Sequence, residues 1–262
     1  MMLKIVILGS GNAFAQFNQY QSAHYIEFDE NQKIILDCGP AILQAVQSSD
    51  VNIDDLDCLF ISHLHGDHLA GLPFLLLYYK FVVNRINKPL HIYGPPGLLN
   101  QLENLFNGNY PNLLLNDNSL YEIHEIGLNE TKKVLGSVSV TSFEANHIPN
   151  AFGYTVEKNN LKIIYSGDNE FKPEQIKYFD NGTVLIHEMN TMDSTAGGHT
   201  SWILFKEHID KILEKVGKII AVHTSIDVRN ENESTFEQKL IRARDGSTFL
   251  FNDKGRLYQM ML

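Results

Sequence analysis

The segment SHLHGDH at residues 62–68 carries three histidines and one aspartate within six residues, directly after an apolar run at residues 58–61. Imidazole nitrogens and carboxylate oxygens are the ligands that zinc and similar divalent ions prefer. We therefore interpret the segment as a loop that faces two adjacent metal ions, rather than as a solvated histidine-rich turn. Its four candidate ligands are His63, His65, Asp67 and His68.

Further ligands are expected from later in the chain, because four residues cannot complete two ligand shells. His147, Asp168 and His223 each stand at the carboxyl end of a predicted strand, where a loop would face a site. Taken singly, such a residue is more often a hydrogen-bonded loop residue than a ligand. Their common position favours a shared site.

Short segments rich in Ile, Val and Tyr, bounded by Gly, Asp or Asn, recur along the chain and predict strands. These segments are residues 4–8, 24–28, 33–37, 58–61, 90–93, 120–126, 137–143, 153–157, 162–166, 183–187, 218–222, 248–252 and 256–260. Helical patterns lie at residues 41–47, 69–83, 98–106, 173–179, 201–216 and 236–244. Two strand-rich halves flanked by helices indicate one layered α/β domain over residues 1–262, with helices outside two sheets.

The composition is that of a globular protein, with 44% hydrophobic and 20% charged residues in a chain of 262. The formal net charge of -10 argues against a surface that binds nucleic acid or anionic lipid as a whole. We interpret Cys38 and Cys58 as two buried, reduced thiols. The first residues lack the features of a signal peptide, and no apolar run reaches the length of a membrane span. We expect a cytoplasmic protein with no membrane partner.

Several motifs, taken in order, resemble those of the metallo-β-lactamase superfamily, and within it the ribonuclease Z branch of zinc phosphodiesterases. The motifs are SHLHGDH followed by LAGLP, together with ILGSGNAF (7–14), ILDCGPAILQ (35–44), HIYGPPGL (91–98), HEMN (187–190) and GGHTS (197–201). The likeness spans nearly the whole chain. It implies a four-layer αββα sandwich and a hydrolase that acts on phosphodiesters.

The resemblance also implies how the candidate ligands divide between two divalent ions. His63, His65 and His147 would hold one ion, whereas Asp67, His68 and His223 would hold the other, with Asp168 bridging both. Zinc suits this mixture of His and Asp best, and manganese or iron fits the same shell. Two ions about 3.5–4 Å apart can share an attacking hydroxide, and the resemblance gives Asp67 the role of orienting it or accepting its proton.

A proton donor for the leaving oxygen is implied by Glu188 and His199, which match an acid pair of the family. The alternative is that His199 only caps the following helix, together with Thr200 and Ser201. The remaining histidines match no ligand position, and we interpret them as structural or solvated. They are His24, His91, His124, His187 and His208.

The substrate is the least determined feature of the sequence. Only residues 158–161 separate two predicted strands where tRNA-processing relatives carry a long arm, and no basic cluster offers a docking surface for RNA. A small or cyclic phosphodiester is therefore favoured, and tRNA 3′ processing is the alternative. A thioester or lactone hydrolase, and a non-enzymatic metal-binding protein, are further alternatives. Arg229 is the first cationic residue after His223 in the sequence and could contact a substrate phosphate. We expect the loop at residues 190–198 to lie near the pocket. A homodimer is compatible with the resemblance to the family.

Overall fold

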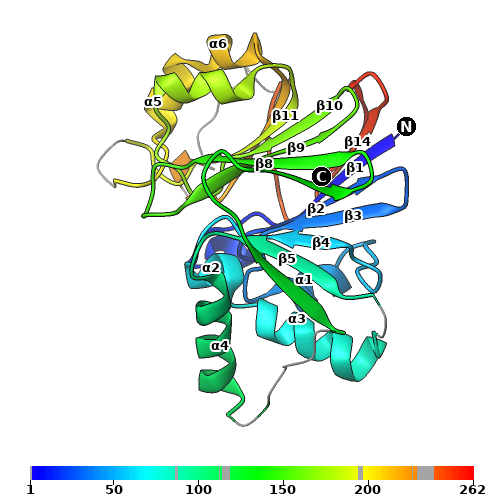
Figure 1. Cartoon of the computed structure of the whole chain (residues 1–262). Helices are drawn as coiled ribbons and strands as arrows, with labels where there is room; N and C mark the ends of the chain where they lie inside the picture. Colours follow the sequence, from blue (N-terminus) through cyan, green and yellow to red (C-terminus); the bar gives the residue numbers. More distant parts are fainter. Residues whose placement is uncertain are drawn as a thin grey trace.

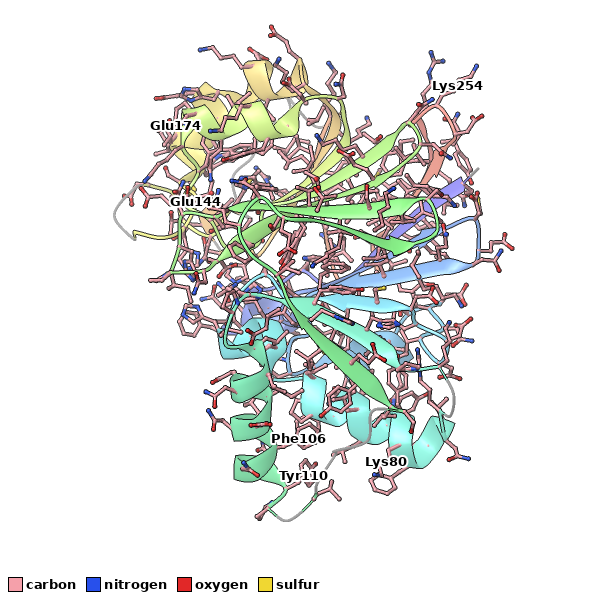
Figure 2. All side chains as sticks on the ribbon, viewed as in Figure 1. Lys80, Phe106, Tyr110, Glu144, Glu174 and Lys254 are labelled. Carbon is pink, nitrogen blue, oxygen red and sulfur yellow. The ribbon has the colours of Figure 1, made fainter. Side chains whose placement is uncertain are left out.

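The computed structural model describes residues 2–85, 88–111, 113, 119–193, 197–225, 227–228 and 239–262. Two mixed sheets face each other, and helices cover the outer face of each (Figure 1). This arrangement is the αββα order of layers that the sequence predicted. Side chains from both sheets fill the space between them (Figure 2).

The first sheet has the strand order β15-β14-β1-β2-β3-β4-β5-β6. Its strands are β1 (Met2–Gly9), β2 (Ala23–Phe28), β3 (Gln32–Leu36), β4 (Cys58–Phe60), β5 (Leu90–Gly94), β6 (Tyr121–Glu125), β14 (Thr248–Asn252) and β15 (Leu257–Met261). The second sheet has the order β13-β12-β11-β10-β9-β8-β7. Its strands are β7 (Thr131–Leu135), β8 (Val138–Glu144), β9 (Phe152–Lys158), β10 (Leu161–Tyr165), β11 (Gly182–Glu188), β12 (Val216–Val222) and β13 (Leu240–Arg242).

The helices divide between the two outer faces. The first sheet is covered by α1 (Ile42–Gln47), α2 (Gly66–Leu69), α3 (Leu72–Tyr78) with its π-helical extension η2 (Tyr79–Val83), and α4 (Leu98–Asn109). The second is covered by the 3-10 helix η3 (Pro173–Phe179), α5 (Trp202–Glu207) and α6 (Ile209–Leu213). A further 3-10 turn, η1 (Gln16–Asn18), follows β1.

Strand β1 shows how the sequence builds these layers. Its odd-numbered residues Leu3, Ile5 and Ile7 lie in the core between the sheets, and Val6 and Leu8 lie in the core beneath the helices. Successive side chains of a strand point to opposite faces, so a strand covered on both faces is apolar throughout. The second sheet is packed in the same way against η3, α5 and α6.

The helix predicted over residues 201–216 is interrupted and ends early. His208 separates α5 from α6, with its backbone N–H bonded to Phe205 O at 3.0 Å and its Nδ1 lying 3.1 Å from Leu204 O. The side chain thus takes the carbonyl that a continuous helix would give to the backbone. The helix ends at Leu213, and Val216 is already the first residue of β12.

Two strands were not predicted from the sequence. Residues 240–242 were predicted to be helical, but they form β13, which pairs in parallel with β12; residues 236–238 of that helix lie outside the described part of the chain. Strand β7 was not predicted at all, and it pairs with β8 at the edge of the second sheet. Both strands depend on a long-range partner, which a local pattern does not reveal.

The topology brings several strand ends to one edge of the molecule. Strands β10, β11 and β12 are parallel neighbours, so the residues that follow them emerge on the same side. The segment after β4 reaches this side from the first sheet, since Phe152 N donates to Ser62 O at 2.9 Å.

Both cysteines are buried and free, as predicted. Within the described residues, no helix has the length and apolar character needed to cross a membrane.

Candidate metal centre

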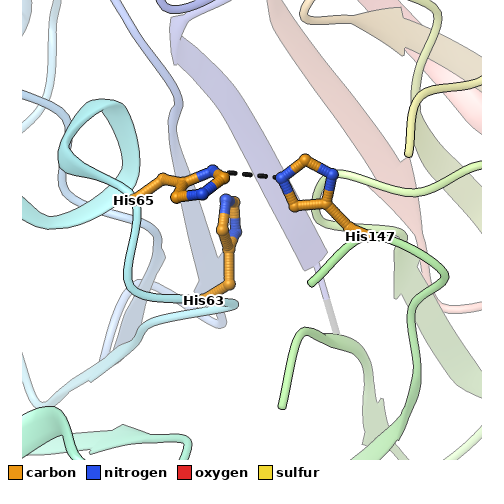
Figure 3. A group of neighbouring side chains, drawn as sticks. All are labelled: His63, His65 and His147. Carbon is orange, nitrogen blue, oxygen red and sulfur yellow. Dashed lines mark hydrogen bonds between the residues drawn. The ribbon is translucent and has the colours of Figure 1, made fainter. Parts of the chain in front are cut away.

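Three histidines converge on one point from two different sheets (Figure 3). His63 and His65 follow β4, and His147 follows β8. His65 Nδ1 lies 3.0 Å from His147 Nε2, and one nitrogen from each of the three rings lies within 4.8 Å of the others. The structure therefore brings together the three residues that the resemblance assigns to one ion.

A second group stands beside the first and contains Asp67, His68, Asp168 and His223. Asp67 Oδ2 lies 3.3 Å from His68 Nε2 and 3.3 Å from His223 Nε2. Asp67 and His68 belong to the short helix α2, whereas the other two residues follow β10 and β12. One ligand atom from each of the four lies within 4.8 Å of the rest.

Asp168 lies between the two groups and directs one oxygen to each. Its Oδ1 is 3.2 Å from His68 Nε2 and 3.5 Å from His223 Nε2. Its Oδ2 is 3.9 Å from His63 Nε2 and 3.9 Å from His147 Nε2. A carboxylate in this position can contact two cations at once.

The donor atoms fit divalent metal ions. His63 Nε2, His68 Nε2 and Asp168 Oδ1 are buried and have no hydrogen-bond partner among the described residues. Leaving such atoms unpaired is costly, because each loses its bonds to water on folding. Cations that accept imidazole and carboxylate ligands would satisfy all three, and zinc, manganese and iron have this preference.

Hydrogen bonds behind the ligands fix their orientation. His68 Nδ1 donates to Asp37 Oδ2 at 2.7 Å, and His147 Nδ1 donates to the backbone carbonyl of Gly198 at 2.7 Å. Each bond leaves the Nε2 atom free to face the centre, as is usual for histidines that bind a metal.

Asp37, whose side chain is fully buried behind the centre, had no predicted role. It also accepts hydrogen bonds from Ser62 N, Ser62 Oγ and the hydroxyl of Tyr165. Its φ of 62° lies in the left-handed region, which Asp tolerates better than most residues. The sequence signal that could have identified Asp37 is its position as an acidic residue directly after the buried strand β3, within ILDCG.

At this centre, nearby charges oppose the effect of burial on the pKa values of His68 and Asp168. Burial by itself would lower the pKa of His68, but Asp168 and Asp37 outweigh it and raise that pKa well above the ordinary value. Burial would raise the pKa of Asp168, but the nearby His223 and His68 hold it well below the usual range. The pKa of His63 is lowered by burial and by the charge of His68. These charges favour an ionised Asp168, a neutral His63 and a protonated His68, so a metal ion that binds His68 would displace its proton.

Glu188 and His199 form a pair beside the centre. His199 Nδ1 lies 2.9 Å from Glu188 Oε1 and 3.9 Å from Asp168 Oδ2. Burial raises the pKa of Glu188, and the hydrogen bond and charge of Glu188 outweigh burial to raise the pKa of His199. The cap of α5 is Ser201, whose Oγ accepts a hydrogen bond from the backbone of Leu204. His199 itself turns toward Glu188.

Two glycines hold the backbone close to the centre. Gly167 precedes Asp168 with φ of 59°, and a Cβ there would lie 2.8 Å from Phe152 O. Gly198 has φ of 85°, and a Cβ there would lie 3.0 Å from His147 Nδ1. A side chain at either position would strain the backbone and displace a neighbour.

The other histidines lie outside these two groups. His24 and His187 are buried, and His208 contacts the helix backbone described above. His91 and His124 lie together on β5 and β6. Arg229 and residues 194–196 of the 190–198 loop fall outside the described residues.

The chain is similar to known proteins along most of its length. The family model described as Anti-Pycsar protein Apyc1 matches residues 3–245. A ribonuclease Z from Methanococcus aeolicus is 26% identical over 242 residues, which cover 84% of this chain and 72% of the relative. An Anti-Pycsar protein Apyc1 from Paenibacillus sp. is 24% identical over 250 residues, which cover 94% of this chain and 98% of the relative.

Solved structures share the fold. The metallo-β-lactamase fold protein YhfI from Bacillus subtilis has a TM-score of 0.78 and 20% identity, covering 95% of this chain and 100% of that one. The short form of human tRNase Z has a TM-score of 0.74 and 22% identity, covering 94% of this chain and 98% of that one. The two facing sheets are therefore those of the metallo-β-lactamase fold, as the motifs implied.

Proposed function

Because the chain belongs to the family of Anti-Pycsar protein Apyc1, we propose that it is a phosphodiesterase that uses two divalent metal ions to cleave a small or cyclic phosphodiester. It is a metal-dependent hydrolase with the metallo-β-lactamase fold. The observation that carries the proposal is the position of Asp168, whose two oxygens face two separate groups of ligands. Cyclic nucleotides are the first substrate class that we would test.

The proposed ligand sets follow the two groups. His63, His65 and His147 would hold one ion, and Asp168 would contribute to both. Asp67, His68 and His223 complete the second set. When bound, the cations supply positive charge to the phosphoryl oxygens and make water a stronger acid. Zinc is the expected metal, with manganese and iron as alternatives.

Two side chains can carry out the proton transfers, Asp67 at the attacking water and His199 at the leaving oxygen. Asp67 reaches into the second group with one carboxylate oxygen and can accept a proton from the attacking water. His199 is held by Glu188 and can donate a proton to the leaving oxygen as the ester bond breaks. The centre thus has a candidate base for the attacking water and a candidate acid for the leaving group.

The surface favours a small substrate. Lys158 of β9 pairs directly with Leu161 of β10, so the connection is a tight turn with no protruding arm. The net charge of -10 also disfavours a long polyanion. A precursor tRNA remains the second candidate, because the chain matches a ribonuclease Z over most of its length. A thioester hydrolase has less need of the pair formed by Glu188 and His199, since a thiolate leaves without protonation; a lactone hydrolase is a further alternative.

We also propose a cytoplasmic location, which the two free, buried cysteines support.

The test of the proposed function is hydrolysis of bis(p-nitrophenyl) phosphate by protein loaded with zinc or manganese, with chelated protein as the control. Metal-dependent turnover is expected, followed by faster turnover of cyclic nucleotides than of a precursor tRNA. Asp67→Asn should abolish turnover, whereas the matched change Asp54→Asn on the surface should not. No turnover of any phosphodiester with metal bound, combined with turnover of thioesters or lactones, would overturn the proposal.

A further inference from the structure

A second cluster of metal-ligand side chains lies on the first sheet, away from the centre described above. His91 belongs to β5, and Glu122 and His124 belong to the edge strand β6. His91 Nδ1 lies 3.1 Å from His124 Nε2 and 3.4 Å from Glu122 Oε2. His124 Nε2 lies 3.6 Å from Glu122 Oε2. The three ligand atoms form a nearly equilateral triangle.

Regular strand pairing builds this triangle. In the parallel register of β5 and β6, His91 lies opposite Glu122, and Tyr93 lies opposite His124. Residues two apart on a strand point to the same face, so the three side chains share one face of the sheet. The ring of His124 is also stacked on Tyr93 with centroids 4.6 Å apart, and Tyr93 is stacked on Phe60 at 4.7 Å. The positions are therefore set by rigid backbone and by ring packing.

The size of the triangle matches a tetrahedral zinc site. Zinc lies about 2.0–2.1 Å from histidine nitrogen, and with tetrahedral angles two of its ligand atoms lie about 3.3 Å apart. The three observed separations of 3.1, 3.4 and 3.6 Å fall around this value. Two histidines and one glutamate, with a fourth position left to water, are a ligand set that zinc uses in proteins.

Hydrogen bonds within the triangle cannot join all three atoms at once. When both imidazoles are neutral, His91 Nδ1 carries at most one proton, which it can donate well to either His124 Nε2 or Glu122 Oε2 but not to both. A cation at the centre of the triangle would contact all three atoms at once. We propose that His91, Glu122 and His124 form an additional zinc site, separate from the catalytic centre, that ties the edge strand β6 to β5.

The strand register separates this site from the centre. Cys58 of β4 lies opposite His91, and His63 follows Cys58 by five residues. His63 lies beyond the end of β4, whereas His91, Glu122 and His124 lie within β5 and β6, and the two ligand groups share no residue. The side chains of His91, Glu122 and His124 are 37%, 46% and 34% exposed, so a metal ion can reach them from solvent.

The test is the number of zinc ions that the full chain retains after equilibrium dialysis against buffered zinc, measured by metal analysis. His124→Gln should bind one equivalent fewer than the wild type, and the matched control His208→Gln should bind the same number as the wild type. Glu122→Gln changes a half-exposed carboxylate and serves as a second variant if His124→Gln is misfolded. It should likewise lower the count or weaken the binding of that one ion.

A second readout separates this inference from the proposed function. In a variant that lacks two of the centre ligands, His63→Ala with His68→Ala, added zinc should still raise the melting temperature, and His124→Gln in that background should reduce the rise. Phosphodiester turnover of His124→Gln alone should equal that of the wild type. Equal zinc counts for the wild type, His124→Gln and Glu122→Gln would overturn the inference, whatever the phosphodiester assays show.

Discussion

Asp37 Oδ2 accepts a 2.7 Å hydrogen bond from His68 Nδ1, although the two residues stand 31 positions apart in the sequence. Both side chains are fully buried. The bond fixes the tautomer of His68 and directs its Nε2 toward Asp168, 3.2 Å away. A buried carboxylate behind a histidine also increases the basicity of the ring, which strengthens its bond to a metal.

Asp37→Asn should therefore weaken metal binding without unfolding the protein. Asn keeps the shape of the side chain and tolerates the left-handed φ of 62°, but it removes the charge that faces His68. We expect a loss of about 10–100-fold in metal affinity or activity, measured by titration with zinc and by turnover at saturating metal. The control is Asp29→Asn, which also has a positive φ of 53° and lies at the end of β2. Equal losses in both variants would contradict the assigned role.

His199→Asn should slow the hydrolysis of substrates with a poor leaving group far more than of those with a good one. Protonation of the leaving oxygen contributes about 10²–10⁴-fold where an alkoxide departs, whereas p-nitrophenolate needs little help. We expect that loss in kcat for a cyclic nucleotide and a small change for bis(p-nitrophenyl) phosphate. A uniform loss for both substrates would indicate that His199 positions other residues instead of donating a proton.

Two adjacent glycines provide a matched pair for testing the support of His147. A Cβ on Gly198 would lie 3.0 Å from His147 Nδ1 at a φ of 85°, whereas a Cβ on Gly197 would meet nothing within 4 Å. Gly198→Ala should cost about 1–2 kcal/mol of folding free energy and weaken metal binding by His147. Gly197→Ala should change neither quantity. Chemical denaturation and zinc titration of both variants check this prediction, and similar behaviour of the two would refute it.

Buried His187 should make the protein less stable in mild acid. Burial lowers its pKa to about 4, and its ring lies among Phe171, Phe179 and Phe205. Between pH 6.5 and 4 the unfolded chain binds a proton at this position and the folded chain does not, so the free energy of unfolding falls as the pH falls. The slope from this residue is at most about 1.4 kcal/mol per pH unit.

The measurement is the free energy of unfolding from pH 7.5 to 4.5 for the wild type and for His187→Gln. The difference between the two curves cancels the titration of the other groups, and it should change steadily below pH 6.5. Parallel curves over this range would show that His187 titrates alike in both states.

The sequence predicted most elements of the fold because their patterns are local. Strand β1 alternates between two apolar layers, and the apolar run after Cys58 gives β4. One error arises from a distant contact, because residues 240–242 form β13 by pairing with β12. The other is local, because the side chain of His208 contacts the carbonyl of Leu204 four residues earlier and interrupts the helix predicted over residues 201–216.

The chain by itself determined the class of the protein, because SHLHGDH and the later histidines and aspartates are chemically specific and occur in a fixed order. Only the tertiary structure decided how these residues are oriented. Asp168 directs its two oxygens to different groups, Asp37 lies behind His68, and His91 meets His124 across two strands. These relationships depend on how the strands pair and on where each side chain points, and the distances between the atoms must be right to within tenths of an ångström. The spacing of residues along the chain specifies neither the pairing nor the side-chain directions.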